Sequence, residues 1–461
     1  MEGVPRSAWL TLGVVSMAVF MVAMELTIIA LALPEIRSSL SAASPAALSW
    51  VVNAYSIVVA ALLLVSGWLA DRYGRKRVFR AGLVLFALGS VAAGASTSIA
   101  MLIAARAVQA IGGAMQYPAG MALLLDAWPR SRHQTAIGTW GAMGGLAAGV
   151  GPAIGAGLIE AFGWRAVFYV NVPVALAALW VGGRILPEST GDVPDTRVDM
   201  IGVPLASAGV GAIILGIVQG ETWGWGAAAT LSCFVVGALM IAAFAWRSRS
   251  HPAPLFDLGL LRLRSFLLGN LGSLFFALGF FALLIPLPSF VQDVWGWSVL
   301  ETGLAYSVGP LVSFLVAPQA GRLADRVGNA PLLTAGSICG MTGVVWLFVT
   351  VSAEPSLARL LVATVLVGVS AGMGFSQLVG AALRDIPNQR FAMATAGRTT
   401  FFQLSVALAI AVGFTLIGDP ATAAAELDAF RKVWLVCAVA YFCNLVLFSL
   451  VYPRWARPRP R

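Results

Sequence analysis

Charged side chains are scarce in this chain of 461 residues, because Asp, Glu, Lys and Arg make up only 11% of it. Soluble domains carry about a quarter of their residues as charges. Hydrophobic residues account for 59% of the chain, and the mean hydropathy is +0.88. A water-facing globular fold is therefore excluded. The long apolar runs instead predict membrane-spanning helices, each of which needs about 20 apolar residues.

Histidine and cysteine are also rare. The two histidines fall in expected loops, and the four cysteines lie in apolar runs without the spacing of metal ligands. The GxxxxGK[S/T] pattern of a phosphate-binding loop is missing. We therefore expect a protein that is not an enzyme, with no catalytic residues, no metal site, no cofactor and no ATP hydrolysis of its own.

The apolar runs number fourteen, and this predicts an all-α polytopic membrane protein. They lie at 8–33, 47–69, 78–97, 100–124, 135–159, 165–186, 200–219, 227–246, 266–290, 299–320, 330–351, 357–382, 393–417 and 432–452. An even number of spans places both termini on one side of the membrane. The first run is too long for a signal peptide and is interpreted as the first helix.

The basic residues indicate which side that is. Of the 29 Lys and Arg residues, 22 fall in the termini and one alternate set of loops, and five fall in the opposite set. Basic loops remain cytoplasmic, so we expect a multi-pass protein of the inner, cytoplasmic membrane with both termini inside. The charges are dispersed over short loops, which does not favour a nucleic-acid partner. The expected partners are the lipid bilayer and a small hydrophobic molecule, with the protein acting as a monomer.

One charged phrase occurs twice. Gly67–Arg77 reads GWLADRYGRKR, and Gly321–Gly328 reads GRLADRVG, 254 residues further on. Six helices with short loops occupy roughly 180–190 residues, so this spacing leaves room for two more. We therefore predict a six-helix bundle at 1–186, a linker with two inserted helices at 187–264, and a second six-helix bundle with a short basic tail at 265–461. Internal duplication of this kind is typical of transporters.

The repeated phrase resembles the signature loop of the major facilitator superfamily, and three further stretches resemble its fourteen-helix drug:proton antiporter branch. A single copy would be explained by a basic connecting loop, whereas two copies favour a gate shared by two halves. The resemblance implies the major facilitator fold. It also implies gating residues, which are Gly67, Asp71, Arg72, Gly74, Arg75, Asp325 and Arg326.

The second stretch, Leu102–Ala114, resembles the family pattern L-x-x-x-R-x-x-Q-G-x-G, with Ala110 in place of the first glycine. An arginine inside the membrane is costly and needs a partner in the bundle interior. The resemblance implies that Arg106 couples proton movement to conformational change. The alternative is that Arg106 only holds this helix to the first one by hydrogen bonds.

The third stretch is the glycine-rich Gly141–Gly157. In the family, a G-P-x-x-G-G pattern here is associated with antiport rather than symport, which gives an antiporter motif of Gly149, Gly151, Pro152 and Gly155. The alternative is a packing face, because small residues spaced by four let helices approach closely.

The fourth stretch, Met24–Pro34, contains Glu25 where the family branch has an aspartate. Glu25 is the one acidic residue placed well within an apolar run. Desolvation favours the protonated form of a carboxyl group, so Glu25 is a candidate proton site. A permanent, purely structural ion pair with a basic residue is the alternative.

Polar and aromatic side chains expected on the bundle interior are candidates for contact with cargo, through stacking and cation–π attraction. They are Asn53, Tyr55, Gln109, Gln116, Tyr117, Trp140, Gln377, Arg398 and Gln403. The expected function is export of hydrophobic, often cationic compounds in exchange for protons. A dedicated exporter of one endogenous metabolite or lipid, and a proton-symport uptake carrier, remain alternatives.

Overall fold

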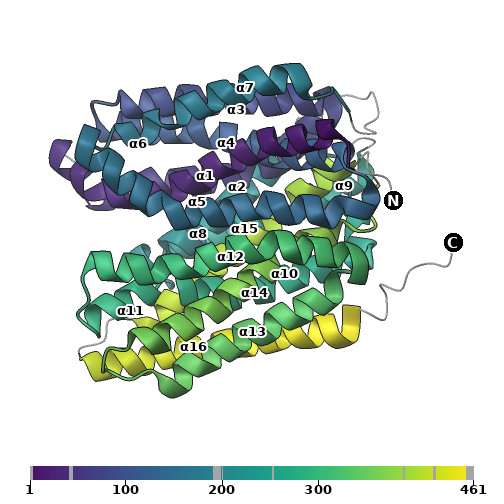
Figure 1. Ribbon diagram of the computed structural model, residues 1–461. Helices are drawn as coiled ribbons and strands as arrows, with labels where there is room; N and C mark the ends of the chain where they lie inside the picture. The colour runs from purple at the N-terminus through teal and green to yellow at the C-terminus, as the bar shows by residue number, and fades with distance from the viewer. Residues whose placement is uncertain are drawn as a thin grey trace. The chain divides into compact units, whose positions relative to one another are not determined.

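The computed structural model describes residues 4–40, 45–190, 199, 201–251, 254–387, 390–418 and 422–452 (Figure 1). Within them, fourteen helical stretches are long and apolar enough to cross a membrane. This confirms the predicted number of spans and the all-α polytopic class. Two spans are interrupted, since α6 with α7 forms one of them and α10 with α11 another.

The contacts divide the chain into two compact units. The first unit comprises Met1–Arg130, Val150–Leu260 and Ile386–Thr400, and the second comprises Ser131–Gly149, Leu261–Asp385 and Phe401–Arg461. Two helices, α5 (His133–Phe162) and α15 (Phe391–Ile417), therefore contribute one part to each unit. The predicted bundle limits at 186 and 264 stay a prediction.

Apart from these two, the helices of the first unit follow the chain order. They are α1 (Arg6–Ser39), α2 (Pro45–Tyr73), α3 (Arg75–Gly94), α4 (Ile99–Ala127), α6 (Ala166–Tyr169), α7 (Asn171–Ile185), α8 (Gly202–Trp223) and α9 (Ala228–Ser250). Helix α4 packs against α1, α2 and α3, while α8 packs against α2 and α9. The inserted pair α8–α9 is thus attached to this unit through α2.

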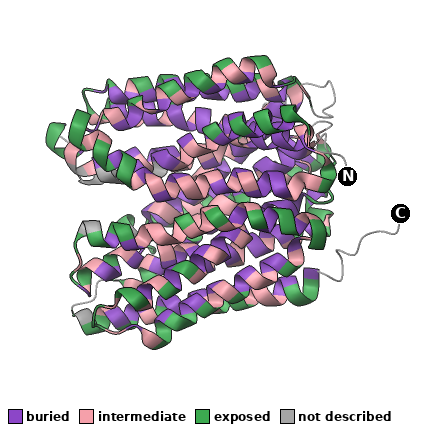
Figure 2. Ribbon diagram, viewed as in Figure 1, coloured by how far each residue is buried: buried purple, intermediate pink, exposed green. Residues whose placement is uncertain are grey.

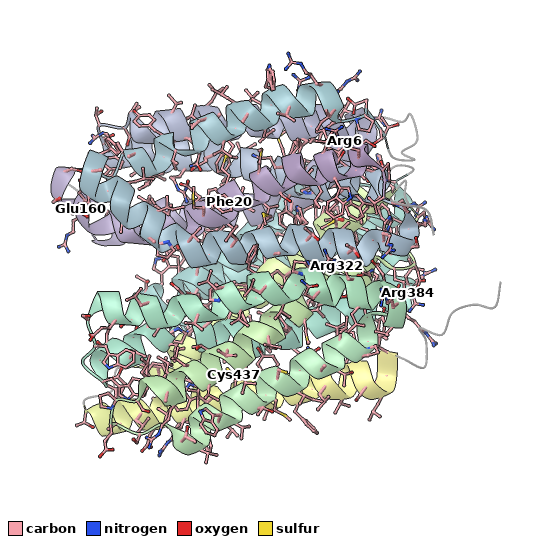
Figure 3. All side chains as sticks on the ribbon, in the orientation of Figure 1. Arg6, Phe20, Glu160, Arg322, Arg384 and Cys437 are labelled. Atoms are coloured by element: carbon pink, nitrogen blue, oxygen red, sulfur yellow. The ribbon has the colours of Figure 1, made fainter. Side chains whose placement is uncertain are left out.

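The second unit holds the remaining helices. They are α10 (Arg264–Leu284), α11 (Leu287–Asp293), α12 (Val299–Val327), α13 (Asn329–Thr350), α14 (Leu357–Leu383) and α16 (Ala423–Val446), the last continued by a π-helical turn at Leu447–Val451. Helix α14 packs between α12 and α13, and α16 covers α10 and α13. Cys437 lies in the middle of α16, buried in this core (Figure 3).

Exposed apolar side chains lie along the outer sides of the units. On α7, Leu176 and Trp180 are 57% and 66% exposed. Figure 2 shows exposed residues along the outer sides of α7 and α16, with buried residues facing their neighbours. An apolar surface of this kind suits contact with lipid, because acyl chains offer no hydrogen-bond partners to polar side chains.

Several helices extend beyond the predicted runs, for example α1, α12 (to Val327) and α16. Helix α1 continues to Ser39, and α16 begins at Ala423, nine residues before the predicted run at 432. The first turns of α16 carry the charged Glu426 and Asp428, and Thr422 caps them by accepting the N–H of Ala425 (3.2 Å). Hydropathy detects only the part of a helix that suits hydrocarbon, whereas helical hydrogen bonding continues into the polar region.

Candidate functional site

Glu25 of α1 and Arg106 of α4 form an ion pair in the interior of the first unit. Arg106 Nη1 lies 2.6 Å from Glu25 Oε1, and the two side chains are 0% and 2% exposed. Small residues surround the arginine on α4, which leaves space for its guanidinium between helices. Buried charges require a partner, and here Glu25 and Arg106 are the partners of each other.

Neighbouring groups fix both members of this pair. Arg106 Nε donates to the carbonyl of Val51 (3.1 Å), Nη1 also donates to Gln109 Oε1 (2.5 Å), and the guanidinium lies 4.4 Å from the Tyr55 ring centroid. Asn171 Nδ2 donates to Glu25 Oε2 (2.5 Å). Both carboxylate oxygens of Glu25 therefore accept a hydrogen bond, so protonation would disturb contacts to α4 and α7.

Asn171 was not among the residues singled out from the sequence. Its signal is a single asparagine inside the apolar run 165–186, at the first residue of α7 after the short α6. It is fully buried. Polar residues in such runs face the bundle interior, but periodicity alone does not identify which acid they meet.

Asp71, near the end of α2, contacts the first turn of α15. Its Oδ2 accepts the backbone N–H of Met393 (2.9 Å), and its Oδ1 accepts Nε and Nη2 of Arg75 (3.1 and 2.9 Å). Arg75 is 1% exposed and also pairs with Asp126 of α4 at 2.5 Å. A carboxylate at a helix start satisfies N–H groups that lack an intrahelical partner. We refer to this arrangement as the α2–α15 contact.

Two other residues of the first phrase support this contact. An added Cβ at Gly67 would lie 2.4 Å from Cβ of Ala396 on α15, so only glycine permits the observed separation. The Arg72 guanidinium lies 5.7 Å from the Trp68 ring centroid. In the second phrase, Arg326 is exposed.

Asp325, near the end of α12, repeats the arrangement in the second unit. It accepts the backbone N–H groups of Gln134 and Thr135 (3.0 and 3.2 Å) and the Thr135 hydroxyl, all in the first turn of α5. Asn329 stands in the place of Arg75, four residues after the aspartate, and donates to Gln134 Oε1 (2.8 Å) and Gln377 Oε1 (2.9 Å). We refer to this as the α12–α5 contact. Beside its aspartate, this contact has the amide side chain of Asn329, whereas the α2–α15 contact has the charged Arg75.

The glycines of α5 face different neighbours along its length. An added Cβ at Gly149 would lie 3.1 Å from Leu311 of α12, and one at Gly155 would lie 2.9 Å from Ile28 of α1. Gly151 is buried, and α5 continues through Pro152 without a break. The geometry therefore displays close helix packing at both ends of the motif.

The candidate cargo residues are divided between the units. Gln116 donates to the carbonyl of Gly82 (3.1 Å) and so joins α4 to α3. In the first unit, Tyr117 lies close enough to Arg398 for the two side chains to interact electrostatically. The others have these positions: Tyr55 and Gln109 beside Arg106, Gln377 at the α12–α5 contact, Trp140 buried on α5, and Asn53 and Gln403 half-buried.

A cluster of phenylalanines in the second unit was also missed. The Phe375 ring centroid on α14 lies 5.2 Å from Phe280 and 6.0 Å from Phe281 on α10, and 6.0 Å from Phe402 on α15. Phe281, Phe375 and Phe402 are only half-buried. Phenylalanine is so common in apolar runs that its sequence positions carried no signal.

Comparisons with known proteins agree with this architecture. The chain matches the family model of the Major Facilitator Superfamily over residues 15–199, 193–410 and 270–461. The tetracenomycin C resistance and export protein of Streptomyces glaucescens is 34% identical over 349 residues, which span 74% of this chain and 64% of that protein. The multidrug resistance protein Stp of Mycobacterium tuberculosis is 31% identical over 417 residues, or 90% of this chain and 76% of Stp.

Among solved structures, the human organic anion transporter MFSD10 (TETRAN) is similar in fold. It has a TM-score of 0.69 at 15% identity, and the alignment covers 96% of this chain and 100% of that one. The fourteen spans, the duplicated aspartate-to-helix contacts and the family match over the chain lead to one conclusion. The chain is a multi-pass membrane protein that belongs to the major facilitator superfamily.

Proposed function

We propose that the protein is a proton-coupled antiporter that exports hydrophobic, often cationic compounds across the cytoplasmic membrane. The observation that carries this proposal is the buried Glu25–Arg106 pair. Ionisable residues inside a membrane are costly, and they mark ion pathways and proton relays. The relatives named for tetracenomycin C and for multidrug resistance support export as the direction.

Glu25 is the proposed proton site. When its carboxylate is charged, it holds Arg106 of α4 and Asn171 of α7. Protonation removes the charge that attracts Arg106, and breaking a buried ion pair costs about 3–5 kcal/mol. The affected contacts join three helices, so proton uptake would alter how α1 packs. No bound cofactor enters this scheme, and the proton gradient supplies the energy.

Alternating access requires contacts that form and break in each cycle. The α2–α15 and α12–α5 contacts suit that role, because each consists of a few hydrogen bonds at a helix start. Hydrogen bonds to a carboxylate contribute about 1.5–3 kcal/mol each, so a contact of a few such bonds is reversible.

The proposed cargo contains apolar, commonly aromatic groups. The half-buried Phe281, Phe375 and Phe402 offer ring faces and edges, and aromatic pairs prefer edge-to-face or offset geometry. Cation–π attraction to such rings would favour a cationic group on the cargo.

The proposed location is the cytoplasmic membrane, with both termini inside and the monomer as the working unit. In the first unit, Arg6 lies at one end of the helices and Glu160 at the opposite end (Figure 3). In the second unit, Arg322 and Arg384 lie at the same end of α12 and α14. Basic ends of this kind support a cytoplasmic orientation.

The experiment is proton-driven flux in vesicles reconstituted with the full-length protein. A panel of cationic dyes and polycyclic compounds is added under an imposed pH gradient, and both dye movement and internal pH are followed. We expect cargo and protons to move in opposite directions. Movement in the same direction would overturn antiport in favour of symport, and export of one endogenous compound alone would identify a dedicated exporter.

Glu25→Gln should abolish the gradient-driven flux while the protein still inserts and folds. Glu35→Gln is the matched control, since Glu35 is a half-buried carboxylate on the same helix. Full gradient-driven flux in Glu25→Gln would exclude Glu25 as the proton site.

A further inference from the structure

Two short linkers connect the inserted pair α8–α9 to the rest of the first unit. The leading linker follows α7 and is described over Leu186–Thr190 and at Asp199. The trailing linker follows α9 and is described over Pro254–Leu260. Both make hydrogen bonds to residues outside the inserted pair. Their contacts lie on the two sides of the α2–α15 contact.

The leading linker binds the α3 side. The backbone N–H of Arg75 donates to the carbonyl of Ser189 (2.8 Å), and the Ser189 hydroxyl donates to Asp126 Oδ2 (2.8 Å). Asp126 Oδ2 is the same oxygen that receives Arg75 Nη1. Ser189 therefore fixes both the backbone of Arg75 and the carboxylate that shares its guanidinium.

Glu188 adds a second attachment. Its Oε1 accepts the backbone N–H of Lys76 (3.0 Å), in the first turn of α3. Gly74 has φ of +111°, and a Cβ added there would lie 2.5 Å from Glu188 Oε1. The linker thus sits directly on the α2–α3 turn, where the positive φ of Gly74 favours glycine.

The trailing linker binds the α15 side. The Phe256 ring is buried, and a Cβ added at Gly397 would lie 2.3 Å from it. The backbone N–H of Asp257 lies 3.4 Å from Sδ of Met393, and Arg390 forms an ion pair with Asp257. This linker therefore holds the first turn of α15, which supplies the N–H group bound by Asp71.

The contacts form one continuous series from linker to linker. It runs from Ser189 through Arg75, Asp71 and Met393 to Asp257. The central hydrogen bond joins the Met393 N–H to the Asp71 carboxylate, and each of these two groups is held by one of the linkers. The α12–α5 contact is completed differently, by amide side chains of α5, α13 and α14 in the second unit.

The inserted pair is itself held together between the linkers. Asp199 accepts the backbone N–H of Gly202 at the start of α8 (2.8 Å) and pairs with Arg247 near the end of α9 (2.5 Å). Helix α8 packs on α2 at Gly211, whose Cβ position lies 3.6 Å from Ala61. The inserted pair is therefore a compact hairpin that packs on α2.

We infer that Leu186–Thr190 and Pro254–Leu260, the segments on either side of the inserted pair, set the stability of the α2–α15 contact, with Ser189 and Asp257 as positioning residues. The inference rests on the proposed alternating access, because its consequence is a preference for the state in which α2 and α15 touch. Neither residue is assigned a role in binding cargo or protons. They act through Arg75 and Met393.

The test is hydrogen exchange, followed by mass spectrometry, of the full-length protein in lipid nanodiscs without cargo or gradient. Ser189→Ala removes a hydroxyl that bonds to Asp126, on the far side of Asp71 from α15. We expect the amides in the first turn of α15 to exchange about fivefold faster, as for the loss of one hydrogen bond. Ser189→Thr keeps the hydroxyl and should retain wild-type exchange.

The reciprocal variant is Asp257→Ala, which keeps the backbone N–H near Met393 but removes the carboxylate that pairs with Arg390, just before α15. It should accelerate exchange of the Arg75 amide region, because coupling between two sites is mutual. Ser232→Ala is the matched control, since its hydroxyl donates to the carbonyl of Ala229 within α9, away from the α2–α15 contact. The first turn of α5 is the internal control, because its amides bind Asp325. In both variants it should exchange as in the wild type.

Changes confined to each variant's own linker would overturn the inference. The readout needs no transport, so it is separable from the proposed function. Coupled exchange with no proton-driven flux would overturn antiport and leave the inference standing, whereas flux with uncoupled exchange would do the reverse.

Discussion

Asp71 and Asp325, 254 residues apart, each accept a backbone N–H from the first turn of a helix that starts elsewhere in the chain. The next charged or polar contact differs, because Arg75 follows Asp71 and Asn329 follows Asp325 at the same spacing. The duplicated phrase thus encodes one backbone arrangement with two different electrostatic characters.

Replacing the two aspartates should therefore have unequal effects. Asp71→Ala and Asp325→Ala each remove a cap, which costs about 1 kcal/mol. Asp71→Ala also takes one carboxylate from the buried Arg75, so its thermal midpoint in detergent should fall further. Asp293→Ala, at an exposed acid of α11, is the control. Equal losses for the two variants would contradict the electrostatic difference.

Arg106→Lys should reduce proton-driven flux although the charge is kept. The guanidinium uses Nε for Val51 and Nη1 for Glu25 and Gln109. A single ammonium group does not reproduce that planar set of donors, and each lost hydrogen bond costs about 1 kcal/mol. Flux assays on folded protein test this. Arg359→Lys is the control, and wild-type flux in Arg106→Lys would refute the geometric argument.

Cargo selectivity should depend on Phe375. Phe375→Leu keeps much of the volume but removes the ring, and an aromatic contact contributes about 1 kcal/mol. We expect roughly fivefold weaker binding of polycyclic cargo and little change for an aliphatic cation, measured by competition in vesicles. Phe442→Leu, on an exposed side of α16, should alter neither. Equal loss for both cargoes would indicate a general packing defect.

The link between α8 and α9 should resist acid. Burial opposes ionisation of Asp199, but hydrogen bonds from Arg247 and the Gly202 N–H outweigh it and hold the pKa of Asp199 below its ordinary value. A lowered native pKa gives stability that is present above the unfolded value of about 3.9 and is lost as pH falls through the native one.

The thermal midpoint of wild type should therefore exceed that of Asp199→Asn by a constant amount from pH 8 to pH 5. The difference should shrink only below about pH 4. Parallel melting curves over this range provide the measurement. A difference that already disappears between pH 7 and pH 5 would contradict the assigned pairing.

The fold was largely predictable, because hydropathy over about 20 residues reports on the bilayer rather than on tertiary detail. The fourteen spans and the equivalent turns at Gly74 and Gly328 follow from local sequence, and both glycines have positive φ. The early start of α16 did not follow. Its first turns carry charges that hydropathy assigns to a loop.

The site was less predictable because its contacts join distant helices. Glu25 stood out as an acid in an apolar run, but two roles were open and its partner lies 81 residues away. The structure supplies the ion pair with Arg106, while the proton role remains our proposal. Asn171 was marked only as a single asparagine in an apolar run and Ser189 was not marked at all, since the role of one polar residue depends on the groups it contacts.

Helix α5 carries a further consequence for how its glycine motif should vary among relatives. Gly149 lies against Leu311, whereas Gly155 lies against Ile28. The space available at each end of the motif is therefore limited by a different neighbouring residue. In an alignment, a larger residue at 149 should co-occur with a smaller one at 311, and a larger one at 155 with a smaller one at 28. The two ends of the motif should evolve separately, as if they were different signatures.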